Sequence, residues 1–402
     1  MTRTSLRVAA ALAALAVLPA LAACGATRTP SHHASSSPHA AASPAPSASQ
    51  GMHHAATTPA AQPLRPGERF ATLTMPAAYT PKPPAGGTDE YRCFLLDPKL
   101  SGEDTFLTGA QFQPRNTEVV HHAILFRLDA DRTGEARRMD AASPGEGWTC
   151  FGDAGVEEGE WIGQWAPGVA EVLLDPKLGY PMPAGSALVM QIHYSTLALG
   201  DRPAGADQSS VRLRLASGKL TPLRTATFPA PIELPCTPQE KGPLCERPAA
   251  IADVAKRFGA EAGQAADQLA QLCSGGKPVP GDTQHCDIPV EQPATIHAVL
   301  GHMHLLGRSI SMELNPGKPG AKKLLEVPDY DFDNQTLRPL AEPVQVKRGD
   351  VIRVTCTHDA SLRAQLPLLR DLPPRYVVWG EGTQDEMCLG VAVASPATSA
   401  GS

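Results

Sequence analysis

The sequence has 402 residues, of which 19% are charged and 42% hydrophobic, and its formal net charge is -6. It contains no basic stripe of the kind that nucleic acid requires, so we expect no nucleic-acid partner. The roughly 330 residues that follow a low-complexity start are too many for one β-sandwich and suit two.

The first residues have the features of an export signal. Arg3 and Arg7 precede an apolar run, Val8–Leu21, that is too short to span a bilayer. The run ends in Leu-Ala-Ala-Cys-Gly at residues 21–25, which resembles the lipobox of bacterial lipoproteins. An ordinary small-residue cleavage site is the alternative. We expect residues 1–23 to be a leader and the exported protein to be lipid-anchored to the bacterial cell membrane through Cys24.

Residues 24–67 consist almost wholly of Ala, Pro, Ser, Thr and His. Such a segment has too few large apolar side chains to offset the entropy of ordering. We interpret it as a disordered linker and assign none of its histidines as ligands.

The remainder predicts a mainly β fold. Residues alternate between apolar and polar in Val211–Leu215 and in Ile352–Cys356, as in strands with one solvated face. Ala187–Tyr194 and Tyr376–Trp379 have the composition of buried strands, and Pro-rich connections disfavour long helices.

One segment between these strands has helical periodicity. Apolar residues after Pro248 recur at helical spacing as far as Leu272, although Gly259 and Gly263 weaken the pattern. We therefore predict an N-terminal β domain at 68–230, a linker with a helical insertion at 231–290 and a C-terminal β domain at 291–397.

Besides Cys24 the chain has eight cysteines, an even number that predicts four disulfides in an oxidising compartment. Spacing alone does not fix their pairing.

Histidines inside apolar runs are the first candidate metal ligands. His121 and His122 are adjacent, so they face opposite sides of a regular strand and reach one metal only if the strand bulges or the rings converge from different angles. A core histidine beside an edge histidine is the alternative. His193 lies in the buried strand, where a metal or a hydrogen-bond partner would satisfy its ring.

A second candidate set lies near the C-terminus. His302 and His304 are two residues apart, which places them on the same face of a strand. Met387 precedes Cys388, and a thioether beside two imidazoles selects copper. A core methionine is the alternative.

The order of these motifs resembles that of the copper type II, ascorbate-dependent monooxygenases, which include peptidylglycine α-hydroxylating and dopamine β-monooxygenases. The resemblance extends from about Tyr91 to Val393. The matching segments are Tyr91–Cys93, His121–His122, Trp148–Cys150, Trp165–Gly168, Gln191–Tyr194, His302–Gly307, Tyr330–Gln335, Gly349–Asp350 and Asp385–Cys388.

The resemblance implies two jelly-roll-like β domains, each with one copper ion. It implies that His121, His122 and His193 bind an electron-transfer copper, and that His302, His304 and Met387 bind an oxygen-activating copper. It also implies disulfides from Cys93 to Cys150 and from Cys356 to Cys388. The four cysteines around the helical insertion have no counterpart in the family and could pair as neighbours or nested.

The substrate pocket departs from the family. Peptide-amidating members carry an arginine and a tyrosine at positions that here hold Leu300 and Val391. Without that arginine a peptide carboxylate would lose its main anchor, so we disfavour peptide amidation. Gln191 matches a family glutamine near the first copper and is a candidate catalytic residue. His297 and His358 are not assigned to a site.

We therefore predict a monomeric copper monooxygenase that hydroxylates a C–H bond of a small organic substrate, using O2 and ascorbate or a similar reductant as co-substrate. A copper-binding surface lipoprotein without turnover, or a degenerate relative, is the alternative.

Overall fold

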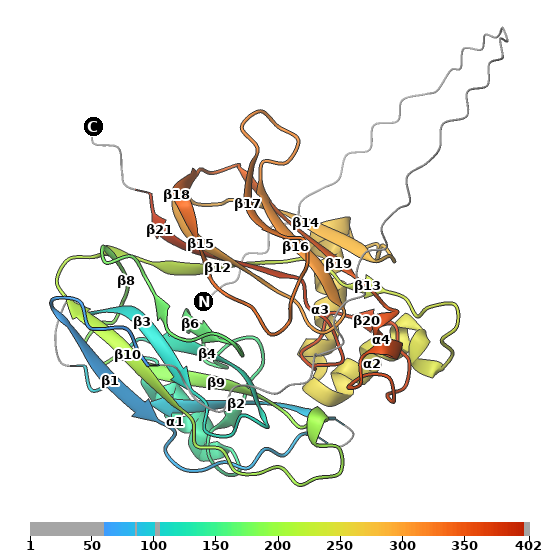
Figure 1. The fold of residues 1–402 in the computed structure, drawn as a ribbon, viewed down its shortest axis with the longest axis horizontal. Coiled ribbons are helices and arrows are strands. Elements are labelled where there is room, and N and C mark those ends of the chain that lie inside the picture. Colours follow the sequence, from blue (N-terminus) through green and yellow to red (C-terminus); the bar gives the residue numbers. More distant parts are fainter. Residues whose placement is uncertain (1–59, 85–86, 101–104, 398–402) are drawn as a thin grey trace, which may run out of the picture. The chain divides into compact units, whose positions relative to one another are not determined.

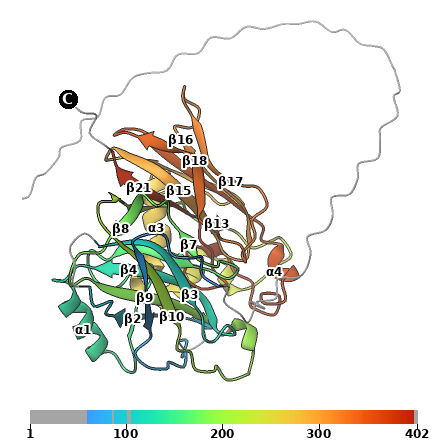
Figure 2. The same ribbon diagram turned by 60° about the vertical axis from the view of Figure 1, so that its left-hand side comes forward.

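The computed structural model describes residues 60–84, 87–100 and 105–397. The leader, Cys24 and most of the predicted linker lie outside these residues. Most of the described strands form two pairs of sheets, which appear as separate groups of early and late strands in two views (Figures 1 and 2). No helix in the described ranges is both long enough and apolar enough to cross a membrane.

The N-terminal pair of sheets shares one apolar core that contains side chains from both. One sheet contains β1 (Glu68–Thr74), β10 (Ser210–Ser217), β3 (Thr105–Gln113), β8 (Leu178–Pro181) and β11 (Thr221–Pro222) in that order, with β7 (Val172–Leu173) paired to β3. The other contains β5 (Trp148–Thr149), β2 (Asp89–Leu96), β9 (Ala187–Ser195), β4 (Val120–Leu128) and β6 (Glu160–Trp165). Helix α1 (Thr133–Ala142) lies between β4 and β5 in the chain.

The C-terminal pair consists of two four-stranded sheets over a second core. One contains β12 (Arg224–Pro229), β21 (Leu389–Pro396), β15 (Ala294–His302) and β18 (Arg338–Val346). The other contains β14 (Thr283–Pro289), β19 (Val351–His358), β16 (Gly307–Leu314) and β17 (Lys322–Val327). Two sheets that share one core in each half make the fold mainly β, as the sequence predicts.

The predicted domain boundaries at residues 230 and 290 stay predictions. Strand β12 lies before the first boundary and β14 before the second, yet both pair with strands of the C-terminal sheets. Neither boundary could be placed better from the sequence, because strand pairing is not visible in local alternation.

The helical insertion is present, but it consists of two helices rather than one. Helices α2 (Arg247–Phe258) and α3 (Ala260–Ser274) meet at Gly259, whose φ of 95° is accessible to glycine and strained for other residues. Gly263 lies within α3, where an added Cβ would stand 2.6 Å from the Cβ of Ala255. The two glycines thus break the helix and let its halves pack closely.

Five smaller elements complete the described fold. Strands β13 (Glu233–Leu234) and β20 (Val377–Val378) pair with each other, so the predicted strand at Tyr376–Trp379 is short. Helix α4 (Leu362–Gln365) follows β19, and single 3-10 turns occupy Leu197–Leu199 and Pro243–Cys245.

Four disulfides are present, as predicted. Cys93 pairs with Cys150, and Cys356 pairs with Cys388, which confirms the two bonds implied by the resemblance. The cysteines around the insertion pair as neighbours, Cys236 with Cys245 and Cys273 with Cys286.

The predicted solvent face of β10 is wrong at Arg214. Alternation places this residue toward water, but its side chain is fully buried and bonds Glu68 at 2.7 Å and Glu171 at 3.0 Å. Paired carboxylates offset the cost of burying the guanidinium, which alternation cannot reveal. Strand β19 does alternate as predicted, and all residues of β9 are buried.

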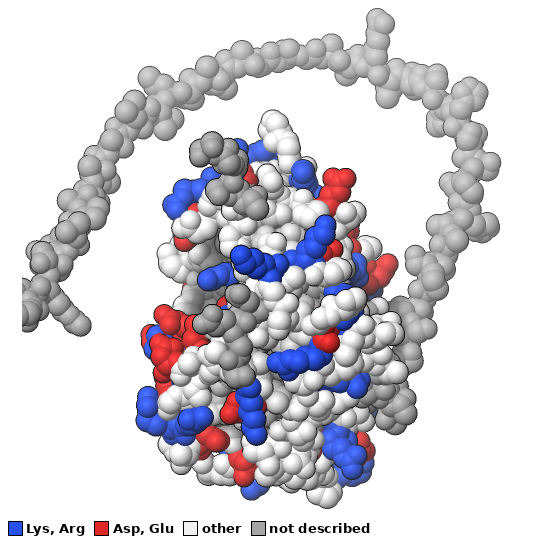
Figure 3. All heavy atoms as spheres, turned by 90° about the vertical axis from the view of Figure 1, so that its left-hand side faces the viewer, with Lys and Arg blue, Asp and Glu red and all other residues white. Residues whose placement is uncertain are grey.

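The charged surface is mixed. On the face shown in Figure 3, lysine and arginine side chains are interspersed with acidic ones.

Candidate metal centre

Three histidines of the first candidate set converge on one point. The Nδ1 atom of His121 lies 3.2 Å from that of His122 and 3.0 Å from that of His193, and the remaining pair is 3.4 Å apart. His121 and His122 lie on β4, and His193 lies on the neighbouring strand β9. The register of these strands shifts between Val120 and His122, a bulge that brings both adjacent rings to one side.

This triangle of nitrogens suits a cation better than protons. In a neutral imidazole each ring nitrogen either donates or accepts a hydrogen bond, so three mutually close nitrogens leave at least one pair unsatisfied. A first-row metal about 2.0 Å from three nitrogens in a tetrahedral arrangement would keep them about 3.3 Å apart. The observed separations of 3.0–3.4 Å fit that arrangement.

Burial keeps these rings neutral and their lone pairs available. Burial lowers the pKa of His122 well below its ordinary value, and the neighbouring His193 and His121 lower it further. For His193, burial lowers the pKa by more than the hydrogen bond with Asp89 raises it. Neutral imidazole is the form that binds a metal.

A buried carboxylate orients the first set by bonding the nitrogen of His193 that faces away from the other two rings. Asp89 lies 2.9 Å from Nε2 of His193, which directs Nδ1 toward the other two rings. Asp89 also accepts a hydrogen bond of 2.5 Å from Thr383, a residue near the C-terminus. Burial raises the pKa of Asp89, but bonds from His193, Thr383 and Thr88 lower it more, so the carboxylate stays ionised.

The second candidate set comes from three segments of the chain. Strand β15 ends at His302, and His304 lies in the turn that follows, so the prediction that both lie on one strand face is wrong. The two rings are nevertheless close, with centroids 5.2 Å apart. Met387 lies in the loop before β21, fixed by the disulfide of the adjacent Cys388 to β19.

Hydrogen bonds fix the orientation of both rings of the second set. His302 Nδ1 donates to Oε1 of Gln335 at 2.5 Å, and His304 Nδ1 donates to the main-chain oxygen of Asp385 at 3.1 Å. Each neutral ring then presents Nε2 as its lone-pair nitrogen. His304 Nε2 is buried without a hydrogen-bond partner, as a metal-binding nitrogen would be in the absence of the ion. Burial and the neighbouring His304 lower the pKa of His302 to about 3.

A carboxylate also supports the second set. Glu386 accepts hydrogen bonds from the main-chain N–H groups of His304 at 2.8 Å and Leu306 at 2.6 Å. It also accepts from the main-chain N–H of Met387 at 3.2 Å, and Nε2 of the buried His358 ring lies 3.4 Å away. Glu386 thus fixes the turn that carries His304 to the loop that carries Met387.

Both sets border one apolar cavity of about 250 Å³. His122 of the first set and His302 and Met387 of the second line it, and the rings of His122 and His302 are 5.8 Å apart. Trp161, Trp165 and other apolar residues form most of the wall. No lysine or arginine is among the described residues that line it.

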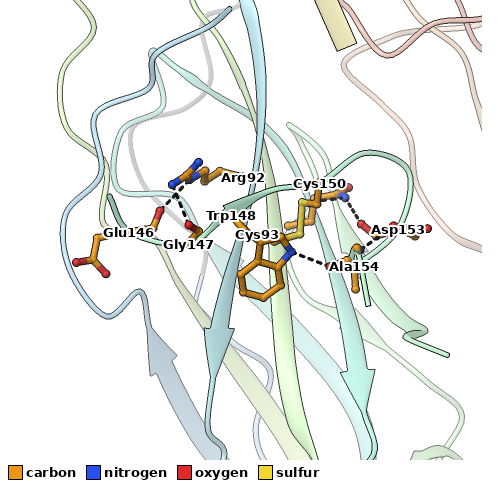
Figure 4. The surroundings of a disulfide bond; sticks show 10 residues. Arg92, Cys93, Glu146, Gly147, Trp148, Cys150, Asp153 and Ala154 are labelled. Atoms are coloured by element: carbon orange, nitrogen blue, oxygen red, sulfur yellow. Dashed lines mark hydrogen bonds between the residues drawn. A yellow bond between two sulfur atoms is a disulfide. The ribbon is translucent and has the colours of Figure 1, made fainter. Parts of the chain in front are cut away.

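Gln191 lines the same cavity, and its side chain also makes a structural hydrogen bond. Its amide nitrogen donates to the main-chain oxygen of Asp153 at 2.7 Å, beside the Cys93–Cys150 disulfide, whose surroundings appear in Figure 4. Its side-chain oxygen is buried without a hydrogen-bond partner. The residue therefore still offers one unused hydrogen-bond acceptor.

His297 stands apart from the candidate site. Its Nε2 lies 2.8 Å from the hydroxyl of Ser395, at the opposite end of β15 from His302.

No role for Asp89, Gln335 or Glu386 was predicted from the sequence. Gln335 and Glu386 fall within quoted family segments, and Asp89 lies two residues before another. The resemblance thus pointed to the region of each residue but not to its partner. Asp89 contacts His193 and Glu386 contacts His304, and these partners are far away in the chain.

Residues 282–392 match the family model described as the copper type II ascorbate-dependent monooxygenase, C-terminal domain. This match supports that family for the chain. The matched segment contains His302, His304 and Met387. The family implies copper, and a set of two imidazoles and one thioether suits that metal. None of the curated proteins compared matches the chain.

The solved structures that resemble the chain do so distantly. The major capsid protein P2 of bacteriophage PM2 is 8% identical, with 83% of this chain and 100% of that chain covered and a TM-score of 0.28. An allantoicase is 10% identical, with coverages of 78% and 90% and a TM-score of 0.18. An f-lectin from striped bass is 8% identical, with coverages of 82% and 97% and a TM-score of 0.17.

Proposed function

We propose that the protein is a monooxygenase with two copper ions that hydroxylates a C–H bond of a small organic substrate. The observation that carries this proposal is that ligands of both sets, His122 on one side and His302 and Met387 on the other, line one cavity. A substrate in that cavity would lie beside both sets. His121, His122 and His193 would hold the electron-transfer ion, and His302, His304 and Met387 the oxygen-activating ion.

Copper at these positions would supply one-electron redox chemistry and oxygen activation. The overall reaction inserts one oxygen atom of O2 into a C–H bond and reduces the other to water. It consumes two electrons and two protons, which ascorbate or a similar reductant supplies. Two one-electron sites account for the two electrons without an organic cofactor.

The chain's own residues orient the ligands and exclude water. Asp89 and Gln335 fix the rings of His193 and His302 through their second nitrogens. Tyr91 stacks on His193 with centroids 4.2 Å apart, and Phe332 stacks on His121 at 4.9 Å. These aromatic faces shield both sides of the first set from solvent.

The cavity wall favours a small, largely apolar substrate. A cavity of about 250 Å³ exceeds the roughly 150 Å³ of a site that accommodates benzene. Leu300 lines the cavity where amidating relatives have an arginine, so a peptide carboxylate has no cationic partner there. This supports the expectation that the protein does not amidate peptides.

We also propose that the protein acts as a monomer outside the cytoplasm, anchored through a lipid on Cys24. Four disulfides support an oxidising compartment. Labelling with a radioactive fatty acid tests the anchor, with Cys24→Ala as the control that should lose the label.

The test of the activity is ascorbate-dependent oxygen uptake by copper-loaded protein across aryl-alkyl amines, glycine-extended peptides and small phenolics. We expect uptake with a small substrate, formation of its hydroxylated product and none with the peptides. Copper binding without turnover on any of them would favour the non-catalytic copper-binding lipoprotein.

A further inference from the structure

The loop Gly380–Cys388, which carries Met387, is held by an ion pair between Asp385 of the loop and Arg257, a residue outside the C-terminal sheets. We call this ion pair the clamp. Within the loop, Asp385 is 3% exposed and accepts a bidentate ion pair from Arg257, with nitrogen-to-oxygen distances of 2.6 and 2.7 Å. Arg257 is 5% exposed and belongs to the last turn of α2, in the helical insertion. A residue of the helical insertion, outside the segments that carry the family resemblance, thus holds the loop that carries a proposed ligand.

Asp385 connects the clamp to both His304 and Met387. Its main-chain oxygen accepts the hydrogen bond from His304 Nδ1 at 3.1 Å, which fixes the orientation of that ring. Its main chain also lies two residues before Met387. Asp385 therefore connects Arg257, through its carboxylate, to two of the three proposed ligands of the second set, through its main chain.

The surroundings leave the clamp little freedom. Asp253 accepts hydrogen bonds from Arg257 and Arg375, each at 2.9 Å, and Arg375 also lies 3.3 Å from Asp385, so two guanidinium groups face two carboxylates. An added Cβ on Gly382 would stand 2.8 Å from both Nη1 of Arg257 and Oδ2 of Asp385. The loop thus approaches the guanidinium as closely as glycine permits.

We propose that Arg257 of the helical insertion, acting through Asp385, is a positioning residue that holds Met387 and His304 in place for the second metal site. This inference rests on the proposed function for its metal, but the positioning itself is a property of the metal-free protein. Only a guanidinium supplies two parallel donors to one carboxylate, so lysine at this position would keep the charge and lose the geometry.

Helix α2 offers a matched control. Arg247 begins the same helix and makes a bidentate ion pair with Glu233 of β13, both distances being 2.7 Å, rather than with the loop. Arg247→Lys therefore removes the same kind of interaction from the same helix. Gly382→Ala is a second way to disturb the clamp, because it keeps every charge and separates Arg257 from Asp385 by steric contact.

The experiment is carbon-13 NMR of methionine methyl groups in the metal-free full chain, with Met387 assigned by Met387→Leu. We expect the Met387 signal to shift or broaden in Arg257→Lys and Gly382→Ala and to stay unchanged in Arg247→Lys. Titration with Cu(I) then reports the second site, whose affinity should fall about 10-fold or more in the first two variants.

An unchanged Met387 signal in folded Arg257→Lys or Gly382→Ala, or an equal change in Arg247→Lys, would overturn the positioning role. If the wild-type chain binds no Cu(I), the proposed function fails, while the methyl signals still decide the role of Arg257. If Arg257→Lys does not fold, Gly382→Ala decides it.

Discussion

The two candidate metal sites differ in how they are built. The first is assembled from neighbouring strands of one sheet, β4 and β9, and its three nitrogens already lie 3.0–3.4 Å apart. The second draws on a strand end, a turn and a loop, in His302, His304 and Met387. Sheet hydrogen bonds fix the first directly, whereas the second depends on Glu386, Asp385 and a disulfide.

The two sites also rest on different observations. The family match covers the second site and not the first, while close convergence of ligand atoms identifies the first. Ligand candidates from both sets line one cavity. A rigid site on paired strands is recognisable from its geometry, whereas a site built from loops is recognised more readily from sequence.

The largest expected effect separates the roles of the two sites. Met387→Ile removes the thioether and should abolish substrate-dependent oxygen consumption while the first site still binds copper. Oxygen uptake and copper content per chain are the measurements. Activity untouched by this change would break the two-site account.

The complementary change is His193→Ala. It removes one nitrogen from the triangle and should stop ascorbate-driven turnover without preventing copper binding at the second site. Copper content should fall from two ions to one. Turnover equal to that of the wild type would exclude the proposed role of His193.

A smaller effect on metal affinity should follow when the ligands of the first site are kept and only Asp89, which orients His193, is changed. Asp89→Asn removes the negative charge beside His193 Nε2, and loss of such a partner typically lowers metal affinity about 10–100-fold. Competition with a chelator of known affinity measures it. The second site should keep its affinity, and an equal loss at both sites would mean that Asp89 acts on the fold as a whole.

The smallest effect concerns Glu381, which lines the shared cavity. Burial, with Asp385 and Asp153 nearby, raises its pKa to about 8. Since this folded-state pKa exceeds the unfolded value of about 4.3, its contribution to stability is present below that value and is lost as pH rises toward 8.

Glu381→Gln should therefore flatten the fall in melting temperature between about pH 5 and pH 8. Thermal unfolding of both proteins across this range is the measurement. Parallel curves would show that Glu381 is not perturbed.

Much of the fold could be predicted from local patterns, and its exceptions have physical causes. Alternation identified β19, and uniform hydrophobicity identified β9, because burial on one face or on both leaves a periodic record. Alternation wrongly predicted that Arg214 is exposed, because its charge is neutralised by Glu68 and Glu171, which are far away in the chain.

The site was predictable as a set of residues but not as a geometry. Adjacent histidines could share a metal if the strand bulged or if the rings converged from different angles, and the bulge at His121 is a property of pairing with β9. The closeness of His122 and His302 depends on how the two pairs of sheets pack, and no local pattern records it.

The central claim is that six side chains form two adjacent metal sites around one cavity. Anomalous diffraction at the copper edge from crystals of copper-loaded protein tests it most directly. We predict two peaks, one among the Nδ1 atoms of His121, His122 and His193 and one among His302, His304 and Met387. A single peak, or copper bound elsewhere, would contradict the account.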